Sequence, residues 1–160
     1  MEHTKFIVIK DQVNAGKSTT IWLLVFTLVK DLHAEVVRLY NQNSETEIKE
    51  LPDTIPSGEE MYDIYAELRW NGHLIIIASR GDDSDMLLGD VKWALQFHPD
   101  YMVCALQTRP INRDIWNAFN EAFPNTQYKR VFFGVEKAED EENALMVKQP
   151  TVDAIIKYMA

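Results

Sequence analysis

The sequence predicts an α/β domain of three layers, in which helices cover both faces of a mostly parallel sheet. Short β-branched and aromatic runs alternate with stretches of helical period along the chain. The length of 160 residues suits one compact domain, and no linker, repeat or low-complexity tract divides it. An apolar content of 46% is enough for a core without disulfides or a structural metal. We therefore expect a single domain spanning residues 1–160.

The first half of the chain begins with a strand, a polar segment and a helix. Residues 4–10 (TKFIVIK) form an apolar, β-branched run that stops at DQVNAGKSTT, and an apolar helical stretch continues to about Leu32. Residues 34–40 (AEVVRLY) predict a second strand. Residues 41–60 are polar, contain two prolines and have no period, which predicts a long functional loop.

A hairpin is predicted around Asn71-Gly72. The two residues separate DIYAELRW from HLIIIAS, and both positions of a type I′ turn require positive φ, which Asn and Gly tolerate. The second arm is apolar on both faces, so we expect it in the centre of the sheet, and we expect the hairpin to add one antiparallel strand.

The second half continues the alternation of strands and helices. Acidic residues precede the first of its helices, and Pro124 ends the second. The predicted elements are a helix over 86–97, a buried strand over 101–107, a helix over 115–123, a strand over 129–135 and a helix over 151–159.

The composition indicates which partners and which cellular compartment to expect. The 16 Lys and Arg against 25 Asp and Glu give a net charge of -9, which disfavours binding to a nucleic-acid backbone. The longest apolar run, residues 21–29, is too short to cross a bilayer, and the N-terminus lacks the pattern of a signal peptide. Cys104 is the single cysteine and lies in an apolar run. We expect a cytoplasmic protein that binds neither nucleic acid nor membrane.

The strongest chemical signal follows the first strand and opens the first helix, as a phosphate-binding loop does. In such a loop, backbone N–H groups cradle phosphates, Lys17 reaches the β- and γ-phosphates, and Ser18 binds Mg²⁺. Thr19 would add a hydroxyl near the α-phosphate. The alternative is an ordinary strand-to-helix turn with an exposed lysine. The residues of the segment are Asn14, Ala15, Gly16, Lys17, Ser18 and Thr19.

Asp11 departs from the full G-x-x-x-x-G-K-[ST] pattern, because it occupies the position of the first glycine. A carboxylate there would face phosphates. Two unit charges about 4 Å apart repel by about 4 kcal/mol at an effective dielectric constant of about 20. We expect reduced nucleotide affinity unless Mg²⁺ or Lys17 intervenes, and Asp11 would pair with Lys17 in the empty site.

With these residues, the chain resembles the P-loop NTPase superfamily. More narrowly, the hairpin at Asn71-Gly72, the segment from Ser79 to Asp82 and the later run from Cys104 to Arg109 resemble a small, uncharacterised group of bacterial P-loop nucleotide-binding proteins. Members of that group carry Gly where this chain has Asp11. The resemblance implies a P-loop NTPase-like fold that binds ATP or GTP with Mg²⁺, without naming a reaction.

The resemblance also implies an acidic residue at the end of the strand beside the phosphate-loop strand, where it holds Mg²⁺. The strand LIIIAS ends instead at Ser79, so Asp82 and Asp83 are the candidates, with Asp82 preferred for the metal. The alternative is that Asp82, Asp83 or Asp85 only caps the next helix. Arg80 either contacts a γ-phosphate or is a solvated loop charge.

Arg109 and Arg113 follow the next strand, where small P-loop kinases carry a lid whose arginines stabilise the transferring phosphoryl group. The alternative is that they pair with the protein's own carboxylates. Residues 41–60 would hold a phosphoryl acceptor. Two functions stay open: Mg²⁺-dependent hydrolysis or phosphoryl transfer, with Lys17 and these arginines as catalytic residues, or a degenerate, non-catalytic module that binds a protein partner.

Overall fold

The computed structural model describes residues 2–11, 17–81, 83–107, 113–135 and 144–160. Within these ranges the chain is an α/β protein with one seven-stranded mixed sheet and four α-helices. None of the described helices is both long enough and apolar enough to span a bilayer. The strands are β1 (Lys5–Asp11), β2 (Glu35–Asn41), β3 (Thr46–Glu47), β4 (Ile64–Trp70), β5 (His73–Ala78), β6 (Tyr101–Gln107) and β7 (Arg130–Gly134). The helices are α1 (Lys17–Phe26), α2 (Ser84–Leu95), α3 (Arg113–Ala122) and α4 (Ala144–Met159).

The sheet has a parallel half and an antiparallel half. Its strand order is β3-β2-β4-β5-β6-β1-β7, and β5, β6, β1 and β7 are all parallel to one another. β4 is antiparallel to β5, β2 to β4, and β3 to β2. Antiparallel pairing thus extends beyond the one hairpin strand that the sequence predicts. The connection after β2 returns to the same edge of the sheet, where Asn41 pairs with Ile64, so β2 and β4 become antiparallel neighbours.

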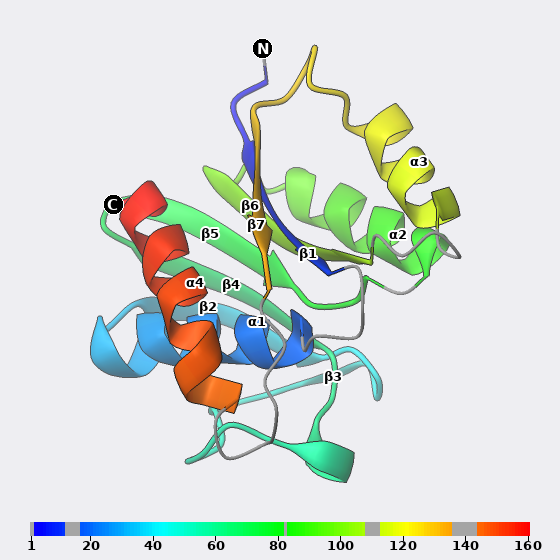
Figure 1. Cartoon of the computed structure of the whole chain (residues 1–160). Helices are drawn as coiled ribbons and strands as arrows, with labels where there is room; N and C mark the ends of the chain where they lie inside the picture. The colour runs from blue at the N-terminus through cyan, green and yellow to red at the C-terminus, as the bar shows by residue number, and fades with distance from the viewer. Residues whose placement is uncertain (1, 12–16, 82, 108–112, 136–143) are drawn as a thin grey trace.

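Helices cover both faces of the sheet (Figure 1). α1 and α4 pack together on one face, and α2 and α3 pack together on the other. The side chains of β1 alternate between the two cores: Ile7 and Ile9 point to α1 and α4, whereas Phe6 and Val8 point to α2 and α3. All seven residues of β6 are buried, which explains why its sequence is a continuous apolar run.

The predicted hairpin is confirmed. Asn71 has φ 53° and Gly72 has φ 79°, the two positive values that a type I′ turn requires. β5 lies between β4 and β6, in the centre of the sheet as predicted. Cys104 on β6 is fully buried, and desolvation raises the pKa of its thiol to about 12, as expected for a small apolar core residue.

Two segments differ from the sequence-based prediction. Residues 41–60 contain the short strand β3 and a 3-10 turn at Gly58–Glu60 rather than loop alone. α4 begins at Ala144, before the predicted start at residue 151, and includes Pro150. Proline usually marks a helix boundary because it removes a backbone hydrogen bond. In the structure α4 packs against α1 and continues through Pro150.

The loop after β5 lies directly against β6. A Cβ atom added to Gly81 would meet the backbone oxygen of Ala105 at 2.3 Å, and the Gln107 backbone N–H donates to Gly81 O at 3.4 Å. A side chain at this position would push the end of β5 away from β6. Glycine is therefore required at position 81, because the backbone of the loop between β5 and α2 lies against the backbone of β6 there.

We expect Gly81→Ala to lower the free energy of unfolding by about 2–3 kcal/mol, because the added methyl group overlaps with backbone. Gly89→Ala is the matched control. A Cβ at Gly89, inside α2, meets nothing within 4 Å, so that variant should be stabilised by about 0.5–1 kcal/mol through helix propensity. Urea unfolding of the two variants checks this, and equal effects would refute the close approach.

Candidate functional site

The carboxyl ends of β1 and β6 form the candidate site. The two strands are parallel neighbours, paired in register as far as Asp11 and Gln107. The helix that follows β1 in sequence, α1, packs on one face of the sheet, whereas the helix that follows β6, α3, packs on the other. Adjacent parallel strands whose connections leave to opposite faces open a crevice at their carboxyl ends, where ligands of α/β proteins bind.

Lys17 is the first residue of α1 and therefore lies at this edge of the sheet. Only 7% of Lys17 is exposed, so the exposed lysine of the alternative is wrong, whereas the turn before it lies outside the described residues. Ser18 and Thr19 are half-buried in the same helical turn. The helix itself is anchored below them by apolar residues and by Trp22, whose indole N–H donates to Tyr62 O at 3.0 Å. A rigid helix thus presents a buried ammonium group and two hydroxyl groups.

Several predicted site residues cannot be placed relative to Lys17. Asn14, Ala15, Gly16, Asp82 and Arg109 lie outside the described residues, as does the loop around Glu136 and Lys137. Asp11 and Arg113 are described only as the last residue of β1 and the first of α3. The predicted roles of these residues therefore stay predictions.

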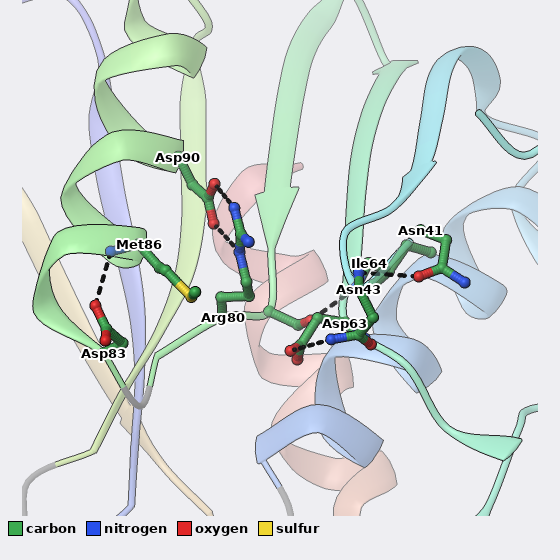
Figure 2. Close-up of polar contacts among 9 residues, drawn as sticks. Asn41, Asn43, Asp63, Ile64, Arg80, Asp83, Met86 and Asp90 are labelled. Carbon is green, nitrogen blue, oxygen red and sulfur yellow. Dashed lines mark hydrogen bonds and ion pairs between the residues drawn. The ribbon is translucent and has the colours of Figure 1, made fainter. Parts of the chain in front are cut away.

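Ser79 follows β5, the strand at whose end the sequence analysis expects a metal-binding acid. That choice of strand is wrong, because β6 lies between β5 and β1 and is itself the strand beside β1. Its hydroxyl accepts from the backbone N–H of Ile64 at 2.8 Å and donates to Asp63 Oδ1 at 3.2 Å. Asp63 is held in turn by Asn43, whose side-chain amide donates to Oδ2 at 3.3 Å and accepts from the Asp63 backbone N–H at 2.7 Å (Figure 2). A carboxylate thus lies beside the end of β5, although β5 itself supplies none.

Sequence reasoning missed Asp63. It precedes β4 by one residue and lies 16 positions before Ser79, so it follows no strand that ends at this edge. The antiparallel hairpin brings the start of β4 beside the end of β5, with Tyr65 paired to Ala78. The available signal was the hairpin register: in an antiparallel pair, residues just before the first strand lie next to residues just after the second.

The remaining acids of this region have structural roles. Asp83 caps α2, because its side chain accepts from the Met86 backbone N–H at 3.0 Å (Figure 2). This agrees with the capping alternative for Asp83, and Asp82 itself lies outside the described residues. Among the described residues, no group of three or more His, Cys, Asp or Glu side chains is arranged to hold a metal ion.

The interpretation of Arg80 as a solvated loop charge is wrong, because its side chain is mostly buried and is paired with an acid. Its guanidinium forms two hydrogen bonds to Asp90 on α2, at 2.9 and 2.5 Å, and the two side chains are 22% and 8% exposed. The bond to Asp90 is the main cause that raises the pKa of Arg80, and the charges of Asp63 and Glu45 add to it. This ion pair ties the loop after β5 to α2.

No protein-family model, curated protein or solved structure matches the chain.

We expect Asp90→Asn to lower the free energy of unfolding by about 2–4 kcal/mol, because it leaves a mostly buried guanidinium without its counter-charge. Asp53→Asn removes an exposed carboxylate from a loop and should change stability by less than about 0.5 kcal/mol. Urea unfolding of both variants measures the difference. Similar values for the two would show that the Arg80–Asp90 pair contributes nothing.

Proposed function

We propose that the chain binds a nucleoside triphosphate, ATP or GTP, together with Mg²⁺ at the carboxyl ends of β1 and β6. The observation that carries this proposal is the buried Lys17 at the start of α1, beside a pair of strands whose following helices lie on opposite faces of the sheet. The P-loop NTPase type of fold is part of the same proposal.

The chemistry of these residues suits a polyphosphate. The ten-residue helix α1 directs its N-terminal N–H groups and the positive end of its dipole towards the strand edge. Lys17 adds a full positive charge that burial strengthens, because nearby water screens it less. In a protein of net charge -9, such a local concentration of positive charge is what an anionic ligand requires.

Mg²⁺ fits the donor atoms of this edge. Magnesium prefers oxygen ligands and is usually held by one or two protein groups together with phosphates and water. The Ser18 hydroxyl would bind it directly, and Asp63, fixed by Ser79 and Asn43, is the described carboxylate that would orient its waters. Asp82 stays a further candidate from the sequence. When bound, the ion would neutralise charge on the phosphate oxygens.

Phosphoryl transfer or hydrolysis is the reaction that this site would support. Lys17 would stabilise charge that develops on the β- and γ-phosphates, and Arg109 or Arg113 would close over the γ-phosphate. Both arginines come shortly after β6, which is one of the two strands that form the site, and Arg113 begins α3. An acceptor would bind at residues 41–60, which return to the edge where β2 and β5 end.

A second function, a non-catalytic module that binds a protein partner, is favoured by one feature of the β5 end. Ser79 stands where the sequence analysis expects an acid, and its hydroxyl is engaged by Ile64 and Asp63. Arg80 and Asp83 are likewise engaged in structural contacts. Together with Asp11 in the phosphate loop, these substitutions are what loss of turnover would produce.

Titration calorimetry with ATP and GTP, with and without Mg²⁺, tests nucleotide binding. We expect Lys17→Ala to weaken binding at least about tenfold, because it removes a charge-assisted hydrogen bond. Lys92→Ala is the matched control, since Lys92 is exposed on α2 and should leave binding unchanged. Asp11→Gly should tighten binding by removing a negative charge near phosphate. Circular dichroism establishes that each variant is folded.

The outcomes separate the proposals. Equal losses in Lys17→Ala and Lys92→Ala, or no binding by either the parent or the Asp11→Gly protein, would refute the nucleotide site. Binding that is lost only in Lys17→Ala, with Mg²⁺-dependent release of phosphate, supports an enzyme. Binding that appears only in Asp11→Gly, without release of phosphate, supports the non-catalytic module.

A further inference from the structure

A second site lies on the face of the sheet that carries α2. α2 packs against β5 and β6, and α3 packs against β6 and α2. Beside α2, residues of β2, β4 and the following loops line a pocket of about 560 Å³. That volume is within the range of small-molecule sites in proteins, about 300–1,000 Å³.

Three aromatic side chains line the pocket: Tyr40, Tyr65 and Trp93. Tyr40 and Tyr65 are paired across β2 and β4, and their ring centroids are 6.0 Å apart. Trp93 lies on α2 and is 51% exposed, although tryptophan has the largest of the apolar side chains. Such an exposed aromatic ring beside two others offers several π-faces to a ligand.

The charges around the pocket are mainly negative. Glu45 and Asp90 line it, and Arg80, the one cation among its lining residues, is neutralised by its paired hydrogen bonds with Asp90. The charges of Glu45 and Asp63 also act on Arg80 and raise its pKa after the larger effect of Asp90. A ligand in the pocket would therefore meet at least one carboxylate that no lining cation balances.

A buried acid lies next to Tyr65, one of the lining residues. Glu67, only 2% exposed, accepts a hydrogen bond from Tyr65 Oη at 3.0 Å. Glu67 is paired with Arg38, 3.7 Å away and 39% exposed, whose guanidinium also lies 4.7 Å from the centre of the Phe97 ring.

The pocket also contains a hydrogen-bond acceptor, on the side chain of Gln42, for which the described residues supply no donor. Gln42 Oε1 is buried and has no hydrogen-bond partner among the described residues, and Gln42 lines the same pocket. A buried oxygen that accepts no hydrogen bond costs about 1–3 kcal/mol, so a ligand that donates to it would recover stability.

We propose that this pocket binds a small organic cation with N–H donors, an alkylamine or an alkylguanidine. Its charge would lie against the aromatic rings and the carboxylates, its N–H groups would reach Gln42 Oε1 and Glu45, and its alkyl chain would displace water from the tyrosines. The proposal does not depend on nucleotide binding. Lys17, at the start of α1 on the opposite face, does not line the pocket.

Titration of the full chain with agmatine, which carries a guanidinium and an amine on a butyl chain, tests the proposal. We expect saturable binding with a dissociation constant at or below about 1 mM that weakens as salt is added. Butyrate, which has a similar chain and the opposite charge, should not bind. N-acetyl-arginine amide tests the source of the cation. If it binds more strongly than agmatine, the pocket is assigned to an arginine side chain of a partner. If it binds more weakly, the pocket is assigned to a free amine.

Two variants connect binding to the pocket. Glu45→Gln, at an exposed position, and Trp93→Leu should each weaken agmatine binding about threefold to tenfold. Glu47→Gln is the matched control, because Glu47 is an exposed acid on β3 that does not line the pocket. Lys17→Ala should bind agmatine as the parent does. Absence of agmatine binding, equal binding of butyrate, or equal loss in Glu45→Gln and Glu47→Gln would overturn the proposal.

Discussion

The constraint on which the rest of the structure depends is the burial of β6 and β1 on both faces. Every residue of β6 is covered, and the side chains of β1 alternate between two apolar cores. Two faces that exclude water require two layers of helices, and here the helix after β1 lies on one face and the helix after β6 on the other. Lys17 begins α1 beside the ends of these two strands.

The antiparallel half of the sheet provides different chemistry from the parallel half. The tight turn at Asn71-Gly72 returns the chain beside itself, so that Asp63 lies next to Ser79 and Tyr65 next to Ala78. Beside α2, Tyr40 and Tyr65 of these strands and the exposed Trp93 line one pocket. The proposed phosphate site and the proposed cation pocket are compatible, because each would have its own local charge.

Electrostatics distinguish the two sites despite the net charge of -9. Several acids are held by specific partners: Asp90 by Arg80, Asp83 by the start of α2, and Asp63 by Ser79 and Asn43. These contacts determine which carboxylates act on a ligand and which stabilise the fold. Net charge gives the mean field of the protein, whereas a ligand responds to the charges within about one Debye length of its site.

The sequence by itself determined the features that depend on neighbouring residues. The type of nearly every element, the positive φ of Asn71 and Gly72, and an acidic cap on α2 follow from local sterics and hydrogen bonds. The burial of Lys17, the antiparallel pairing of β2 and the contacts of Asp63 and Arg80 were decided only by the tertiary structure. Each of these joins residues from separate elements, so it depends on how strands are ordered and helices packed, and a local pattern carries no information about that order.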